Sequence, residues 1–464
     1  MTKRLLSYFA LAIAIMLVVA CNSEPQLQND EVVKPRSPNQ ENVLQVWWEK
    51  GFNPEEDEAL QTLFNDWQQK TGNQIKHLYG GSDELSQKLK RTIQAGNVPD
   101  LLATSKPEKA FIARLAWEGK LTDVSDVIDL ANNPYPEDIL QAVKLYNDVE
   151  QKPGYYAIPL YQATVHVYYW RDLLNKAGFS DRDIPQNWNE FWQFWTEVQD
   201  RLPNQQGRNI YGLGLPVSIE AADTFQVFEH ILEAHNISIV DSQGQLQIDS
   251  PQIRSGIIKI LDWYKQLYQQ GYIPPEALHW SNPDNNRDFL NRSVLMTPNQ
   301  TLSIPAAVRQ ESEIYGNKLG IVDLPQKPNR QKMEHLTVVD QIVLFAESPR
   351  QLLAKNFLTY LSQPEIIGKY LKSSGNRFSP VHKAIWKTPF WQNSQDVYVS
   401  TVAKTLTKEP TRPYHTVQNP AYGEILQENV WGQALNKVLA DSIPSEQAAD
   451  EAIARIKEIF AGWN

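Results

Sequence analysis

Strand-like and helix-like segments alternate along the chain, and this alternation is the feature that most constrains its fold. Residues 43–48 form an apolar strand segment, and residues 60–67 carry their apolar positions on one helical face. A second helical segment ends at Gly96, before a short strand over residues 100–103. Strands that alternate with helices predict an α/β sheet with helices packed against it.

The same pattern restarts in the middle of the chain. Residues 164–170 alternate in apolar character, which predicts one further strand. Asn187, with a glutamate three residues later, has the spacing of a capping box, and Ser250-Pro251 opens another helix. A final amphipathic helix begins at Ser445. We therefore expect two α/β lobes that are helical in most of their residues.

The composition limits what the chain can do. Of its 464 residues, 42% are apolar and 21% are charged, so it can bury a substantial core. The formal net charge of −10, without a block of lysine and arginine, argues against nucleic-acid binding. The single cysteine excludes intramolecular disulfides and cysteine-rich metal sites. We expect no nucleic-acid partner, no metal and no cofactor.

The N-terminus has the pattern of an export signal. Two basic residues precede an apolar run over residues 5–20, which is shorter than the roughly 20 residues that span a bilayer. The run ends in Val-Val-Ala-Cys, which resembles the bacterial lipobox, where the cysteine, here Cys21, is lipidated. The polar, proline-containing residues 22–42 predict a flexible tether. We expect residues 1–21 to be a lipoprotein signal peptide, and the folded body to be anchored on the periplasmic side of the cell envelope.

Motifs of common catalytic sites are absent from the sequence. It has no nucleophile elbow, no phosphate-binding loop and no zinc-protease motif. Its histidines are scattered, and His230 and His235 are too far apart to share one helical face. Paired carboxylates for glycoside hydrolysis stay open, because the fold sets their separation. We expect no catalytic residues.

Five segments in order carry a family resemblance. They are Val46–Trp67; Gln87–Leu89 with Gln94–Asp100; Tyr156–Pro159 with Val167–Gly178; Pro185–Phe191; and Lys355–Leu361 with Gly375 and Pro380. Together, and after a lipobox, they resemble the family-1 extracellular solute-binding proteins of ABC importers, the maltose-binding-like sugar receptors.

The resemblance implies a two-lobed, type II-like periplasmic-binding-protein fold, with ligand held in the cleft between lobes joined by several hinge crossings. Lobe one would comprise residues 43–158 and 336–380, and lobe two residues 162–328 and 384–464. The crossings would fall near Pro159–Tyr161, Pro325–His335 and Phe378–His382. Such a receptor captures a carbohydrate or sugar-like osmolyte for the membrane permease subunits of an importer. We expect it to act as a monomer.

A sugar receptor needs planar hydrogen-bonding groups for hydroxyls and an aromatic ring for the C–H face of the sugar. In α/β sheets such groups lie at strand ends and on the crossing segments. The candidate ligand-binding residues chosen on this basis are Trp47, Trp48, Glu49, Thr104, Ser105, Lys106, Tyr161, Gln162, Trp280, Asn299, Asp340, Arg377, Arg412 and Tyr414.

Asp340 is the most informative acid among these candidates. It interrupts an otherwise apolar strand over residues 338–345, and a buried carboxylate needs a partner. That partner is either the ligand or an internal cation. Leu302 stands where the resembled family often places a tryptophan, so one stacking platform is missing, and Trp280 is the candidate to replace it.

Three alternatives to a sugar receptor remain open at this point. A receptor for a charged solute such as glycerol phosphate would use Lys106, Arg377 and Arg412. A secreted glycosidase would use Asp340 and Glu49 as its acid and base. A structural lipoprotein of the envelope would have no ligand.

Overall fold

The computed structural model describes residues 42–104, 107–130, 134–202, 209–241, 243–392, 394–415 and 419–463. The predictions for the signal peptide, Cys21 and the tether up to residue 41 lie outside these ranges, as do Ser105 and Lys106. Residues 42–464 form one compact unit. In the part of the chain so described, no helix has both the length and the apolarity needed to cross a membrane.

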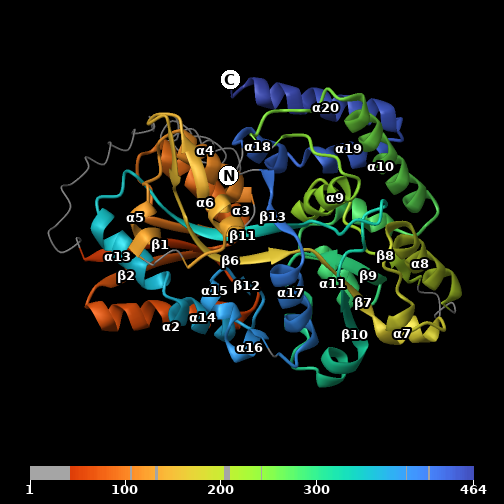
Figure 1. Ribbon diagram of the computed structural model, residues 1–464, viewed down its shortest axis with the longest axis horizontal. Helices are drawn as coiled ribbons and strands as arrows, with labels where there is room; N and C mark the ends of the chain where they lie inside the picture. Colours follow the sequence, from red (N-terminus) through yellow and green to blue (C-terminus); the bar gives the residue numbers. More distant parts are fainter. Residues whose placement is uncertain are drawn as a thin grey trace, which may run out of the picture. The chain divides into compact units, whose positions relative to one another are not determined.

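Two main β-sheets organise this unit, as the α/β prediction requires (Figure 1). The large sheet has the order β12 (Ser379–Pro380), β6 (Ile158–Thr164), β11 (His335–Leu344), β3 (Leu101–Thr104), β1 (Val43–Glu49), β2 (Gln74–Gly80), with β13 (Thr411–Pro413) paired to β11. The small sheet has the order β10 (Leu319–Val322), β7 (His166–Trp170), β9 (Val294–Asn299), β8 (Tyr211–Leu213). A separate hairpin joins β4 (Lys144–Asn147) and β5 (Lys152–Tyr155).

Helices surround both sheets. Those that follow the large-sheet strands are α2 (Pro54–Thr71), α3 (Ser82–Gln94), α4 (Pro107–Trp117), α5 (Ser125–Leu130), α6 (Glu137–Val143), α13 (Gln351–Leu361) and α14 (Pro364–Ser373). Those that follow the small-sheet strands are α7 (Arg171–Lys176), α8 (Trp188–Arg201), α9 (Ala222–Ala234), α10 (Pro251–Gln269), α11 (Asp284–Leu290) and α12 (Ser303–Ala307). The C-terminal part contributes α15 (Lys383–Trp386), α16 (Pro389–Gln392), α17 (Val397–Lys408), α18 (Ala421–Gln427), α19 (Val430–Leu439) and α20 (Ser445–Ala461).

Local sequence signals set several helix ends. The side chain of Asn187 accepts a hydrogen bond from the backbone N–H of Glu190 at 3.0 Å, which caps α8 as predicted. Helix α10 begins at Pro251, as the Ser-Pro signal predicts. Helix α2 ends at Gly72, whose φ of 73° is a left-handed conformation that glycine adopts without strain.

The prediction of one strand over residues 164–170 is wrong. β6 ends at Thr164 and β7 begins at His166, and the two strands belong to different sheets. Every residue of both strands is buried, so the alternation in the sequence reflects no exposed face. The chain therefore passes from one sheet to the other at Val165, and it returns between β10 and β11. In Figure 1, β6 and β11 run through the middle of the fold.

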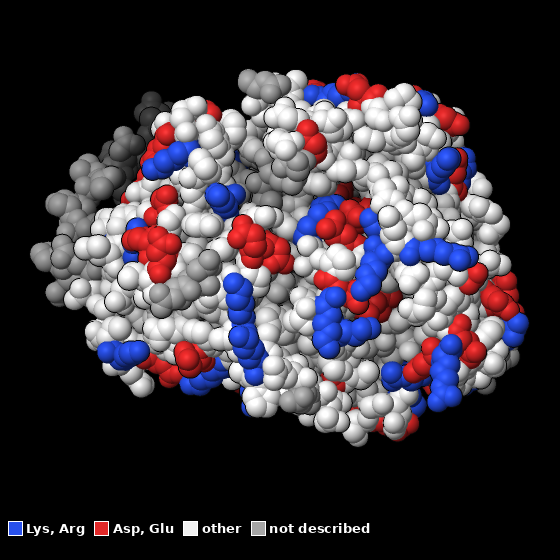
Figure 2. Space-filling model, viewed as in Figure 1, with Lys and Arg blue, Asp and Glu red and all other residues white. Residues whose placement is uncertain are grey.

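Charged side chains of both signs mix on the surface of the described residues. Figure 2 shows lysine and arginine interspersed with aspartate and glutamate over the visible face. Many of these groups are paired across elements, for example Lys355 with Asp126 at 2.8 Å and Lys369 with Asp66 at 2.8 Å. Such exposed pairs contribute little to stability.

Candidate functional site

The carboxyl ends of the parallel strands β1 and β3 form one edge of the large sheet. β1 ends at Glu49 and β3 ends at Thr104. Strand pairing sets Thr104 beside Gln341 of β11, and sets Asp340 beside Tyr161 of β6. The fold therefore brings several predicted residues to the edge where α/β sheets place their ligands.

A polar pocket opens at this edge, and we call it the charged pocket. Its walls come from the end of β1, the start of α2, β6, α14 and the segment before β12. The lining residues are Trp48, Glu49, Lys50, Gly51, Glu56, Asp57, Leu60, Tyr161, Tyr370, Arg377 and Phe378. Four of the predicted residues are among them: Trp48, Glu49, Tyr161 and Arg377.

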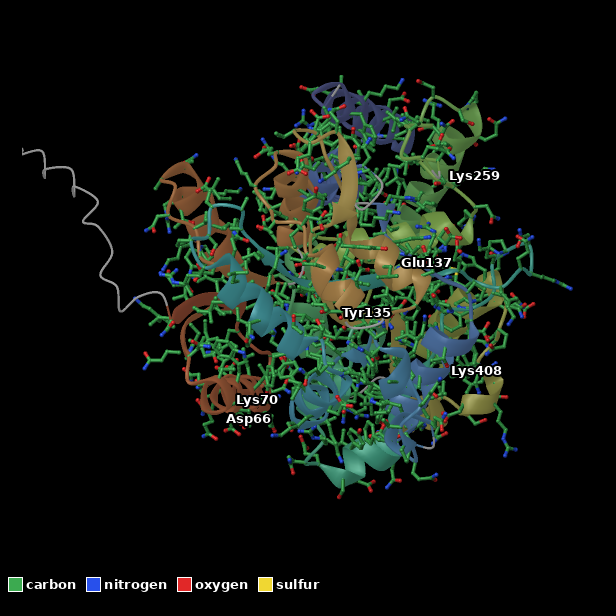
Figure 3. The ribbon with its side chains drawn as sticks, turned by 60° about the vertical axis from the view of Figure 1, so that its left-hand side comes forward. Asp66, Lys70, Tyr135, Glu137, Lys259 and Lys408 are labelled. Atoms are coloured by element: carbon green, nitrogen blue, oxygen red, sulfur yellow. The ribbon has the colours of Figure 1, made fainter. Side chains whose placement is uncertain are left out.

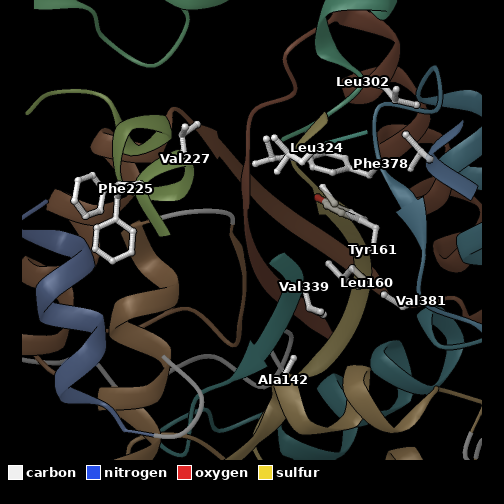
Figure 4. Packing of buried hydrophobic residues seen from close by; sticks show 14 of the residues in the cluster. Ala142, Leu160, Tyr161, Phe225, Val227, Leu302, Leu324, Val339, Phe378 and Val381 are labelled. Carbon is white, nitrogen blue, oxygen red and sulfur yellow. The ribbon is translucent and has the colours of Figure 1, made fainter. Parts of the chain in front are cut away.

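Stacked aromatic rings form one wall of the charged pocket. The rings of Tyr161 and Phe378 lie 4.2 Å apart at an interplanar angle of 26°, and Figure 4 shows them side by side. The ring of Tyr370 stacks on Tyr161 from 6.2 Å. Burial raises the pKa of Tyr161 well above its usual value, helped by the nearby charges of Asp340 and Glu49. The phenol is therefore a neutral hydrogen-bonding group in an aromatic wall.

The arginine of the charged pocket already has a protein partner. Arg377 Nη1 lies 3.0 Å from Glu56 Oε2, and the guanidinium lies 4.6 Å from the ring centre of Phe378. The Glu56 carboxylate also accepts a hydrogen bond from the backbone N–H of Phe52 at 3.1 Å. Burial raises the pKa of Glu56, and the charge of Arg377 opposes that rise. Each ionic group thus compensates the other.

A second pocket, here called the apolar pocket, lies between helices of the two lobes. It is lined by Ile112, Ala113, Ala142, Leu145, Ala222, Gln226, Thr337, Val338, Val339, Gln341, Pro413, Tyr414 and Leu426. Two of these side chains, Gln226 and Gln341, are 4% and 5% exposed, and their amide oxygens accept no hydrogen bond from the described residues. A buried acceptor without a donor is destabilising, so a ligand that donates would be favoured there.

The second predicted cation, Arg412 of β13, is paired like the first. Its Nη2 lies 2.7 Å from Glu233 and its Nε lies 3.2 Å from Glu334. Nearby, Tyr414 is buried at the apolar pocket, and its hydroxyl lies 3.4 Å from His230 Nδ1. Burial raises the pKa of Tyr414 well above its usual value, so this phenol is neutral too.

Segments that follow the two sheets touch around these pockets. After β9 of the small sheet, the backbone N–H of Leu302 donates to the carbonyl of Arg377 at 3.1 Å. On the other side, Arg114 of α4 lies 3.1 Å from Glu424 of α18. These contacts lie beside both pockets, and we refer to the two pockets together as the cleft.

Other predicted residues lie in local structural contacts instead. Trp280 is buried, and its indole N–H donates to Asp288 at 2.9 Å. The side chain of Asn299 accepts from the N–H of Thr301 at 3.0 Å. The remaining two are Gln162, whose side chain donates to the carbonyl of Pro380 at 2.7 Å, and Trp47, whose ring lies 5.3 Å from the ammonium of Lys88. The side chain of Thr104 lies outside the described part.

Sequence reasoning missed several residues that line the two pockets. Phe378 and Tyr370 complete the aromatic wall, and Glu56 neutralises the arginine. Gln341 could have been found, because it follows Asp340 in the same apolar strand. Gln226 gave no signal, because α9 is buried on nearly every side and its polar residues follow no helical period.

No cluster of three or more potential metal ligands occurs in the described ranges.

Several known proteins are similar to this chain in sequence or in fold. YcjN of Escherichia coli (strain K12), named as a periplasmic-binding protein of an ABC transporter, is 21% identical over 78% of this chain and 75% of its own length. A solute-binding protein of an ABC transporter from Thermotoga lettingae, solved with α-D-tagatose, has a TM-score of 0.74 at 19% identity, covering 90% of this chain and 99% of that one.

Maltose-bound MalE3 of T. maritima has a TM-score of 0.69 at 20% identity, covering 90% of this chain and all of its own. These similarities support the two-lobed fold. The model of one protein family, bacterial extracellular solute-binding proteins, matches residues 62–397. The chain belongs to this family of bacterial extracellular solute-binding proteins.

Proposed function

We propose that this protein captures a neutral carbohydrate in the cleft and delivers it to the permease subunits of an ABC importer. The observation that carries the proposal is the pairing of the two arginines of the cleft. Arg377 is held by Glu56, and Arg412 is held by Glu233 and Glu334. Neither guanidinium is left to compensate an anionic ligand.

The charge balance of the charged pocket supports the same conclusion. Three carboxylates, Glu49, Glu56 and Asp57, line it against Lys50 and Arg377. A phosphate would enter a site with an excess of negative charge, and desolvating it there would be unfavourable. This weighs against glycerol phosphate as the ligand.

The remaining groups suit a sugar. The buried rings of Tyr161 and Phe378, which stack on each other, give the charged pocket an apolar wall that suits the C–H groups of an uncharged ligand. The buried amide oxygens of Gln226 and Gln341 would accept hydrogen bonds from hydroxyl groups. The tagatose and maltose bound by two proteins of similar fold belong to this chemical class.

We propose no catalytic function for Asp340 and Glu49. Membership in a family of binding proteins supports this, and incubation with oligosaccharides gives a direct test. Recovery of intact oligosaccharide after prolonged incubation is expected. Appearance of shorter products would instead identify a glycosidase.

The hinge belongs to the same proposal. Two of the predicted crossings, near Pro159–Tyr161 and Pro325–His335, have support from nearby passages of the chain between the sheets, whereas the strands before and after the third, near Phe378–His382, both belong to the large sheet. Because a ligand that touches both lobes favours closure, the radius of gyration in solution should decrease on binding. An unchanged scattering profile at saturating ligand would contradict a hinge.

We further propose that Cys21 carries a lipid anchor and that the following tether links it to the folded body. The Cys21→Ser variant should be exported yet released from the membrane fraction. If this variant stays on membranes, the apolar run over residues 5–20 anchors the chain by itself.

The direct test of the function is native mass spectrometry of gently purified protein. We expect a bound neutral sugar, and titration of that sugar into stripped protein should raise the melting temperature. A co-purified phosphate ester or carboxylate would contradict the proposal. Absence of any stabilising solute in a broad sugar panel would favour a structural lipoprotein.

A further inference from the structure

A large groove lies on lobe two, separate from the cleft, and we call it the outer groove. It lies between α8 and α10, near the end of α9, and has a cavity volume of about 550 Å³. That volume falls within the usual range for small-molecule sites. None of its lining residues also lines the charged or the apolar pocket. Figure 3 labels one of them, Lys259, on α10.

Tryptophans from both helices form the floor of the outer groove. Trp188 and Trp192 are four residues apart, so they share one face of α8. Their ring centres lie 5.5 Å apart, and Trp192 lies 5.3 Å from Trp263 of α10, in edge-to-face contacts. Trp188 and Trp192 are each 3% exposed, whereas Trp263 is half-buried. The floor is therefore a continuous indole surface with one ring partly open to solvent.

Neutral carboxamides form the rim above this floor. Asn189 and Gln193 project from α8, and Gln266 and Gln270 project from α10. All four are exposed, and no hydrogen bond to the described residues engages their side-chain amides. They are free to turn toward a ligand without breaking an internal contact, and each offers both donors and an acceptor.

The outer groove carries little charge. No carboxylate lines it, and Lys259 is its one ammonium group among the described residues. His235 also lines it, and burial together with Lys259 lowers the pKa of that imidazole, so it is neutral at pH 7. An anionic ligand would find a single exposed cation, and a purely apolar ligand would leave the amide rim unused.

We propose that the outer groove is a second binding site, for the sugar rings of a neutral carbohydrate chain. The partly open ring of Trp263, held by the buried indoles beneath it, provides the stacking surface, and the four carboxamides provide hydrogen bonds to hydroxyls. This site does not depend on the ligand of the cleft. Because it is open on one side, we expect affinity in the millimolar range, far weaker than capture in a closed cleft.

The test follows the indole N–H resonances of Trp188, Trp192 and Trp263 by NMR in the intact protein. Maltotriose and cellotriose are the probes, each titrated to about 20 mM, a range that detects millimolar affinity. We expect these three resonances to shift. The Gln266→Ala variant should weaken binding at this site about fivefold or more, the effect of one lost hydrogen bond.

A matched control separates a local effect from a general one. Gln269 lies on the same helix, is exposed and does not line the groove, so Gln269→Ala should leave the titration unchanged. Trp263→Ala removes a ring of the floor and should abolish the shifts, with the melting temperature measured beside it. Equal effects of Gln266→Ala and Gln269→Ala would overturn the proposal.

Two further outcomes decide whether the shifts arise from carbohydrate bound in the outer groove. The shifts should persist in Tyr161→Ala, a variant of the cleft, and their loss there would mean that closure of the cleft caused them. Shifts with octylphosphocholine but with neither trisaccharide would identify an apolar docking face and overturn the carbohydrate site. Shifts at the groove would stand even if the cleft bound no sugar, so the two proposals fail separately.

Discussion

The two pockets of the cleft differ in the chemistry that they present to a ligand. In the charged pocket, the charges of Arg377 and Glu56 compensate each other at 3.0 Å, and the Nε–H of the arginine has no acceptor among the described residues. In the apolar pocket, the walls are hydrocarbon, and the amide oxygens of Gln226 and Gln341 lack donors among the described residues. One pocket contains a compensated ion pair, and the other contains neutral acceptors that need a donor.

This difference explains why a neutral ligand fits the whole cleft. An ion would disturb the compensated pair at one end and would be desolvated by hydrocarbon at the other. A polyhydroxylated ring can lie against Tyr161 and Phe378 and can donate hydroxyl protons to the amides. Substitutions in each pocket therefore test this difference in chemistry.

The largest expected effect comes from breaking the compensated pair. Glu56→Gln leaves the guanidinium of Arg377 buried without its carboxylate, which should lower the free energy of unfolding by about 3–5 kcal/mol. Urea denaturation measures this, and Glu58→Gln, an exposed site on the same helix, should change stability by less than about 0.5 kcal/mol. Equal stability of the two variants would mean that the arginine is available to an anionic ligand.

The second effect is a pH dependence at the apolar pocket. Burial lowers the pKa of His230, which lies against Tyr414, from 6.5 to about 3. The unfolded chain takes up a proton below pH 6.5 and the native state does not, so stability is complete above pH 6.5 and falls as the pH drops toward 3. At pH 5 this group alone should cost about 2 kcal/mol.

Denaturation of wild type and His230→Gln at pH 7.5 and pH 5 isolates this contribution, because the other histidines act equally in both proteins. The stability difference between them should change by about 2 kcal/mol over that interval. Parallel pH profiles would show that His230 is not held neutral.

The third effect concerns stacking in the charged pocket. Tyr161→Ala removes the ring that stacks on Phe378, and should weaken sugar binding by about 1–3 kcal/mol. Tyr161→Phe keeps the ring and should retain most of the affinity. Calorimetry with the co-purified sugar compares the two. Similar losses in both variants would assign the effect to the hydroxyl instead of the ring.

The smallest effect concerns one hydrogen bond in the apolar pocket. Gln226→Leu removes an acceptor and should weaken sugar binding by about 1 kcal/mol. The ligand-free protein should not lose stability, because a buried acceptor without a donor disappears as well. A loss of stability without any loss of affinity would show that Gln226 serves the fold and not the ligand.

Much of the fold could be predicted because its signals are local. Alternating segments predicted two α/β lobes, and the cap at Asn187 and the proline at position 251 predicted the starts of two helices. The break at Val165 could not be predicted. Strands β6 and β7 are buried throughout, so no polar residue marks the corner between the two sheets.

The candidate site was predicted less completely because its contacts are long-range. Arg377 was proposed as a ligand contact, but its partner Glu56 is 321 residues away in the sequence. The paired tryptophans of β1 looked equivalent, yet Trp48 packs on Phe64 and lines the charged pocket, whereas Trp47 lies under Lys88. Only strand pairing and helix packing decide which neighbour a buried side chain meets.

The dependence of affinity on ligand charge and salt decides whether the cleft takes a neutral sugar. Calorimetry would compare the co-purified sugar with glycerol 3-phosphate at about 50 mM and about 500 mM sodium chloride, a range over which exposed charges become screened. We expect the sugar to bind with affinities within about twofold at both concentrations, and the phosphate not to bind. Tight phosphate binding that weakens steeply with salt would contradict the account, even though the two-lobed fold would stand.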